Sequence, residues 1–127
     1  MARATGRFDP LARSWFAAAM IEPENTRVVL VTAPDAETAR RIARQVLESR
    51  LVACVNLVPG IESHYWWQGR IESGQEVLMV MKTTAGRISE LKDAVLAAHP
   101  YDTAAFVVLP IESGSARYLD WIRASVS

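Results

Sequence analysis

Side chains able to do thiol or imidazole chemistry are few in this chain of 127 residues. It has one cysteine, Cys54, and two histidines, His64 and His99. A single thiol cannot form an internal disulfide, and a multi-thiolate zinc site needs more cysteines than the chain has. A lone free thiol is typical of the reducing cytoplasm, which is the compartment that we predict.

The sequence does not indicate an enzyme. A nucleophilic histidine needs an orienting partner and basic groups to bind a phosphate, and His64 is flanked by Ser63 and Tyr65 instead. An acylphosphatase would need a glycine-rich anion cradle with an arginine after its first strand, and "TAPDAETA" (residues 32–39) has neither. We therefore predict no catalytic residues and no required cofactor.

Charge and hydropathy argue against two classes of partner. The chain has 14 basic and 14 acidic side chains, so it carries no net field that would attract nucleic acid. Apolar runs stay well short of the roughly 20 residues that a membrane-spanning helix needs. We predict neither a nucleic-acid partner nor a membrane partner.

The length fits one domain preceded by an extension. Residues 1–25 are rich in arginine and alanine, and we expect a poorly ordered segment or a short amphipathic helix with Leu11 and Trp15 on one side. Residues 26–127 carry the alternation of strand and helix patterns that a folded domain requires. We therefore predict a domain over 26–127.

The first half of this domain predicts a strand, a helix and a long hairpin. Residues 27–33 are β-branched and end at a Pro-Asp turn, and residues 35–50 have the apolar spacing of an amphipathic helix. A second strand starts at residue 51, is interrupted by Pro59-Gly60 and reaches the two-residue turn Gln68-Gly69. In the returning strand we expect a bulge at Ser73-Gly74.

The second half predicts a helix, a strand and a terminal helix. Residues 85–100 have helical spacing and are stopped by Pro100. Residues 103–111 read as a strand, and residues 115–126 as a short helix with Leu119 and Ile122 inward. The order is βαββαβ with an additional C-terminal helix, which indicates an α+β, ferredoxin-like antiparallel sheet with two helices on one face.

The strands are apolar on both sides. In residues 77–81, for example, Val77, Met79 and Met81 point one way while Leu78 and Val80 point the other. Two helices can cover only one face, so the other must be buried by a second copy of the chain or stay exposed as a large apolar patch. We predict self-association.

Three aromatic residues lie near the hairpin tip. Trp66 and Trp67 are consecutive in a strand, so their rings lie on opposite sides of a two-stranded arm that could bury neither. We predict that Tyr65, Trp66 and Trp67 form part of a subunit interface, because buried aromatic anchors carry much of the energy of such interfaces. The alternative is an arm that folds back over its own helices.

Six strings occur in a characteristic order: "VTAPD", "ARQVLESRLVACVNLVPGIES", "YWWQGRIES", "EVLMVMKT", "HPYD" and "LPI...G...YLDWI". Together they resemble the pattern of the CutA proteins, also called divalent-cation tolerance proteins, from about Val28 to Val126. The resemblance implies a ferredoxin-like subunit in a tight homotrimer, built like the PII signalling proteins.

The resemblance also implies tolerance of divalent cations, copper above all, with Cys54 and His99 as the candidate metal ligands. Thiolate and imidazole suit copper and zinc, although two ligands are too few for a closed tetrahedral site. Each of the two residues could equally have a purely structural role. Cys54 could be an inert thiol in an apolar strand, and His99 could stabilise the end of a helix.

A small-molecule sensor of the PII kind is the alternative function. Clefts between the subunits of such a trimer could hold a ligand, and the candidate lining residues are Lys82, Tyr101, Glu112 and Trp121. Glu112 and Trp121 could equally be residues that pack a helix.

Overall fold

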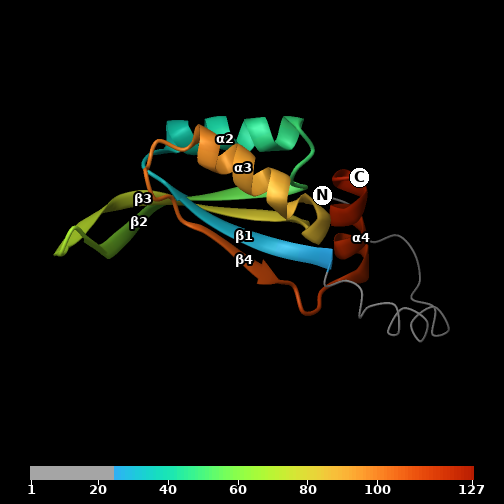
Figure 1. Ribbon diagram of the computed structural model, residues 1–127. Helices are drawn as coiled ribbons and strands as arrows, with labels where there is room; N and C mark the ends of the chain where they lie inside the picture. Colours follow the sequence, from blue (N-terminus) through green and yellow to red (C-terminus); the bar gives the residue numbers. More distant parts are fainter. Residues whose placement is uncertain (1–24) are drawn as a thin grey trace.

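The structure is a computed structural model that describes residues 25–127 (Figure 1). In chain order its elements are β1 (Thr26–Ala33), α2 (Ala36–Glu48), β2 (Cys54–Trp67), β3 (Arg70–Thr84), the 3₁₀ turn η2 (Ala85–Arg87), α3 (Ile88–Ala98), β4 (Phe106–Pro110) and α4 (Ala116–Ser125). The predicted βαββαβ order with a C-terminal helix is confirmed. The expected N-terminal extension and its short helix lie outside the described residues.

The four strands form one antiparallel sheet in the order β2-β3-β1-β4. Helices α2 and α3 lie together on one face, and α4 lies at the end of the sheet away from the β2-β3 hairpin (Figure 1). Two hydrogen bonds fix the C-terminal end of α4, from Arg50 to the Ser125 carbonyl and from Arg87 to the Val126 carbonyl. The predicted α+β, ferredoxin-like fold is therefore confirmed.

Local sequence explains where the two covering helices begin and end. The Asp35 side chain accepts a hydrogen bond of 2.7 Å from the Thr38 backbone N–H, which satisfies one free donor at the start of α2 and lowers the pKa of Asp35. Helix α3 ends at Ala98, and the backbone of the next residue, His99, is extended (φ −82°, ψ 136°). A residue before proline avoids the helical region, so Pro100 ends this helix as predicted.

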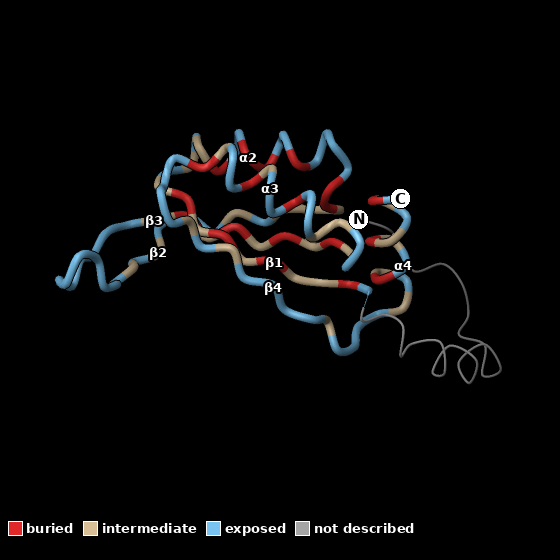
Figure 2. The backbone as a smooth tube through the Cα atoms, viewed as in Figure 1, coloured by how far each residue is buried: buried red, intermediate tan, exposed pale blue. Residues whose placement is uncertain are grey.

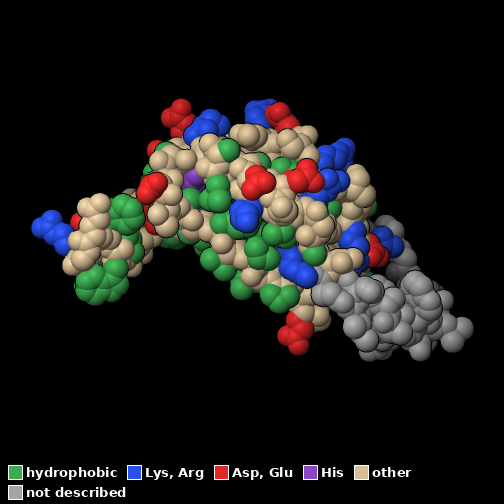
Figure 3. Space-filling model, in the orientation of Figure 1, with side chains coloured by type: hydrophobic (Ala, Val, Ile, Leu, Met, Phe, Trp, Pro, Cys, Tyr) green, Lys and Arg blue, Asp and Glu red, His purple; other side chains and the backbone are tan. Residues whose placement is uncertain are grey.

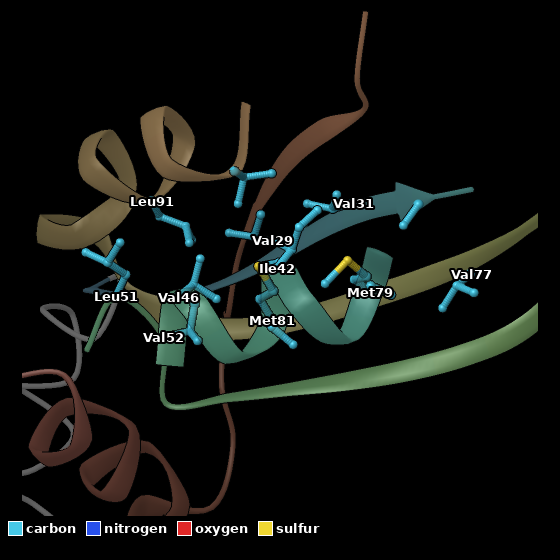
Figure 4. Close-up of a cluster of buried hydrophobic side chains, with 14 residues drawn as sticks. Val29, Val31, Ile42, Val46, Leu51, Val52, Val77, Met79, Met81 and Leu91 are labelled. Atoms are coloured by element: carbon cyan, nitrogen blue, oxygen red, sulfur yellow. The ribbon is translucent and has the colours of Figure 1, made fainter. Parts of the chain in front are cut away.

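The hydrophobic core lies between the sheet and the two helices. Val29 and Met79 from the sheet face Ile42 of α2, and all three are fully buried (Figure 4). Buried and less buried residues alternate along β1 and the inner half of β3 (Figure 2). This period of two means that only one side of each strand reaches the core.

The β2-β3 hairpin extends beyond the sheet as a two-stranded arm (Figures 1 and 2). Its tip is the predicted turn, with φ of +50° at Gln68 and +77° at Gly69. At its base, β2 has one extra residue between Val58 and Ile61, and Gly60 takes a φ of +70° there. The bulge expected at Ser73-Gly74 is wrong, because both residues pair in regular register and the irregularity in β2 alone bends the arm.

The sheet face opposite α2 and α3 is largely apolar. Directly paired residues share a face, and on this face Val28, Leu30, Val58, Leu78, Val80, Val107 and Leu109 stand together. All of them are exposed or half-buried in the single chain, with Val107 at 49% and Leu109 at 44%. In Figure 3 hydrophobic side chains gather along the lower edge of the body and on the arm. We call the sheet face opposite α2 and α3 the open face.

Candidate functional site

A groove of about 860 Å³ lies between the arm, from Glu62 to Trp67, and the loop that follows α3. This volume is in the range of small-molecule sites. Its lining residues are Thr32, Glu62, Ser63, His64, Tyr65, Trp66, Trp67, Glu76, Pro100, Tyr101, Asp102, Thr103 and Ala105. The groove therefore combines aromatic walls with three carboxylates.

Tyr101 joins the loop to the base of the arm. Its hydroxyl donates a hydrogen bond of 3.1 Å to a carboxylate oxygen of Glu76 in β3. Burial and this carboxylate raise the pKa of Tyr101 to about 12. Near neutral pH the phenol therefore stays protonated and remains a donor.

His99 has both ring nitrogens engaged. Nε2 lies 2.7 Å from the carbonyl oxygen of Thr32 in β1, and Nδ1 lies 3.1 Å from the backbone nitrogen of Tyr101. The residue is only 7% exposed. A metal needs a free lone pair on an imidazole nitrogen, so this arrangement gives no support to the prediction that His99 is a metal ligand.

Cys54 begins β2 at the other end of the sheet. It is half-buried on the open face, and its Sγ lies 3.6 Å from the hydroxyl of Tyr118, which stacks on Trp121 with ring centroids 5.6 Å apart. Burial first, and then the thiol, raise the pKa of Tyr118 to about 12. The side chain therefore lies beside α4 at the edge of the open face, outside the buried core.

One chain does not bring Cys54 and His99 together. Cys54 of β2 pairs with Lys82 of β3, and Lys82 pairs with Val28 of β1. His99 instead bonds Thr32, which is four residues further along β1. That offset alone is roughly 13 Å, and β1 and β2 are not adjacent strands. Within residues 25–127 there is also no group of three or more His, Cys, Asp or Glu side chains that could hold a metal ion.

The predicted cleft residues are likewise divided between the two ends of the sheet. Lys82 donates to the Asn56 side chain on the open face. Tyr101 instead contacts Glu76, six residues along β3 from Lys82, a distance of roughly 20 Å. Trp121 belongs to α4 and Glu112 is exposed in the loop before it. A single chain therefore does not bring these residues together, and the cleft between subunits for which they were predicted stays a prediction.

The three predicted interface aromatics are all accessible. Tyr65 is 47% exposed, Trp66 73% and Trp67 43%. The arm points away from the body, so the alternative in which it folds back over its own helices is not what the structure shows (Figure 1). Whether a second subunit covers these rings remains a prediction.

Sequence reasoning missed the polar residues at the base of the arm. Glu62 and His64 lie on one side of β2 with Oε2 and Nε2 2.7 Å apart, and Glu76 holds Tyr101. A signal for Glu62 and His64 was available, because residues two apart in a strand share a face. Glu76 could not be matched to Tyr101, since the two are 25 residues apart in sequence.

The sequence profile described as CutA1 divalent ion tolerance protein matches residues 27–125 of this chain. The chain belongs to the CutA family. The resemblance inferred from the six strings is thereby confirmed.

Individual CutA proteins support the same assignment. A divalent-cation tolerance protein CutA from Thermus thermophilus is 50% identical over 96 residues, which cover 76% of this chain and 93% of the relative. A chloroplastic protein CutA 1 from Oryza sativa is 42% identical over 98 residues, and the match spans 77% of this chain but only 55% of that longer relative. The solved structure of a divalent cation tolerance protein (Cut A1) from Thermus thermophilus superposes with a TM-score of 0.78 at 47% identity, covering 80% of this chain and 99% of that one.

Among the helices of residues 25–127, none is long and apolar enough to cross a bilayer.

Proposed function

We propose that this CutA-family chain is a divalent-cation tolerance protein that acts as a homotrimer and not as an enzyme. The observation that carries the proposal is similarity along nearly the whole domain, at up to 50% identity, to relatives that are named for this function. Copper is the first cation to test, because the family resemblance points to it.

The open face supports the assembled state. Seven apolar side chains stand on it, and several are more than 40% exposed in one chain. Apolar area of this kind is stabilised by about 25 cal/mol per Å² when it leaves water, so a second copy placed there would gain stability. The aromatic residues of the arm would add anchors at the margin of such an interface.

A closed metal site made by Cys54 and His99 of one chain does not fit the geometry, since the two lie far apart and the His99 nitrogens are both bonded. We therefore propose that the protein confers tolerance to the cation, and we assign no residues as ligands of that cation. The small-molecule sensor is the less favoured function, because the relatives are named for cation tolerance. Its predicted cleft lies between subunits, since one chain leaves Tyr101 remote from Lys82.

The absence of catalysis remains part of the proposal. His99 has both ring nitrogens bonded to the backbone. Glu62 does supply the orienting partner that the sequence did not show for His64, but the described lining of the groove contains no lysine or arginine that could bind a phosphate. A cytoplasmic location also remains a proposal: the free Cys54 thiol suits a reducing compartment, while the rice relative is named chloroplastic.

Growth in graded copper tests the proposed function. A host from which the gene has been deleted should tolerate less copper than its parent, and wild-type protein should restore the tolerance. Val80→Glu, which places a charge at the centre of the open face, should restore less if assembly matters. Equal copper tolerance with and without the gene would contradict the proposal.

A further inference from the structure

One buried imidazole ties the loop after α3 to the first strand. His99 follows the last residue of α3, and its Nε2 bonds the Thr32 carbonyl of β1 across 67 positions of sequence. Its Nδ1 bonds the backbone N–H of Tyr101, two residues further along the loop. The side chain is nearly inaccessible, with 7% of the residue exposed.

These two contacts fix the tautomer of the ring. A carbonyl oxygen can only accept a hydrogen bond, so Nε2 must carry the proton that it donates to Thr32. A backbone N–H can only donate, so Nδ1 must be the unprotonated nitrogen that accepts from Tyr101. The neutral imidazole has a single ring-nitrogen lone pair, and Tyr101 already uses it.

The same ring also supports Tyr101 from the side. The two ring centroids are 4.7 Å apart, with the planes tilted by 54°. From this position the Tyr101 hydroxyl reaches Glu76, where the arm leaves the sheet. His99, Tyr101 and Glu76 thus form a continuous series of contacts from β1, through the loop, to the base of the arm.

We propose that His99 is a positioning residue and not a metal ligand. Its neutral imidazole holds Tyr101 against Glu76 and thereby shapes the wall of the groove between the loop and the arm. A divalent cation that binds the protein does not use this imidazole, because binding would have to break the contact that places Tyr101. The inference does not depend on the proposed function.

Two substitutions separate the two contacts. In His99→Asn the amide oxygen falls near the former Nδ1 and can still accept from Tyr101, while the donor to Thr32 is lost. In His99→Gln the longer amide reaches toward Thr32 and the acceptor for Tyr101 is lost. His64→Gln is the matched control, because it removes the other imidazole, which lies exposed on the arm.

Amide hydrogen exchange of Tyr101, followed by NMR on the full chain, is the first readout. We expect His99→Asn and His64→Gln to exchange at nearly the wild-type rate, and His99→Gln to exchange about tenfold faster, as the loss of one hydrogen bond predicts. Equal rates in wild type and both His99 variants would overturn the positioning role.

The second readout is the imidazole itself during titration with zinc chloride, followed by ¹⁵N NMR. We expect His99 to show a protonated Nε2 and an unprotonated Nδ1, with no change in either signal on addition of Zn²⁺.

Calorimetric titration with copper is the third readout. It should give wild-type affinity for His99→Asn and His99→Gln, or no binding in any of the three proteins. A Zn²⁺-dependent shift of a His99 nitrogen, or a loss of copper affinity of tenfold or more in both His99 variants with His64→Gln unaffected, would overturn the proposal.

Discussion

At the scale of single residues, the neighbours of Tyr101 change its pKa and thereby make the stability of the fold depend on pH. Tyr101 is the residue for which pH gives the most direct test, because burial and Glu76 raise its pKa to about 12 from an ordinary value of 10.0. A tyrosine whose pKa is higher in the folded state stabilises the fold below pH 10 and loses that contribution as the pH rises through 12.

We expect Tyr101→Phe to flatten the alkaline loss of stability. The melting temperature of wild type should fall more steeply between pH 10 and pH 12 than that of the variant, because the variant has no phenol at this position to ionise. Glu76→Gln should lie between the two, since it removes the hydrogen bond and the negative charge that help to raise the pKa of Tyr101. Identical alkaline slopes in wild type and Tyr101→Phe would contradict the assignment.

Single-residue roles were only partly predictable from the sequence. His99 and Tyr101 both stood out as candidates, but in separate sites, one as a metal ligand and the other in a subunit cleft. Their contact depends on how the loop lies on β1, and Thr32 is 67 residues from His99. The apolar and polar pattern of one segment gives no information on contacts between residues so far apart in sequence.

At the scale of elements, α3 connects the core to the groove because His99 directly follows its last residue. Its inner side carries the fully buried Leu91, while Leu96 on its outer side is 44% exposed. We expect Leu91→Ala to lower the free energy of unfolding by about 2–5 kcal/mol, because it leaves a cavity between α3 and the sheet.

The matched variant Leu96→Ala should cost less, about 1 kcal/mol or below, because 44% of the residue is already exposed to water. Denaturant unfolding of both variants provides the comparison. Equal losses from the two substitutions would show that α3 packs differently from the structure.

The hairpin turn gives a test of the arm. Gly69 has a φ of +77°, and an added Cβ would meet no atom within 4 Å, so Gly69→Ala is penalised by backbone conformation alone. We expect a cost of about 1 kcal/mol, seen as faster amide exchange along the arm and unchanged exchange in the core.

Gly74→Ala is the control for the turn. Gly74 lies in the same arm, also has open space around it and does not have a positive φ. Its substitution should leave exchange in the arm unchanged. If both alanines accelerated exchange equally, the conformation of the turn would not be the cause.

Helices and strands were more predictable from the sequence than the roles of single residues, because they follow from local signals. Apolar spacing in α2 and the stop at Pro100 both depend on local geometry, and the structure places both elements as expected. The prediction of a bulge at Ser73-Gly74 was wrong, because a glycine in a strand allows a bulge but does not require one. The Pro59-Gly60 interruption had already supplied the extra residue that bends the arm.

For the whole molecule, the decisive feature is a sheet with one face covered and one open. Alternation in β3 predicted both faces correctly, since Met79 is buried by the helices and Val80 remains half-buried on the open face. This pattern is the physical reason for proposing that a second copy covers the open face. It does not fix the number of copies, because that depends on the angle at which neighbouring subunits meet, and the trimer is implied by the family alone.

The mass of the native particle tests this account most directly. Native mass spectrometry of the wild-type protein should give three times the chain mass of 14.1 kDa. Val80→Glu should shift the particle toward single chains because it buries an unpaired charge, whereas Leu47→Glu, on the exposed side of α2, should keep the wild-type mass. A wild-type particle of one chain would contradict the account, because the open face would then lie in water.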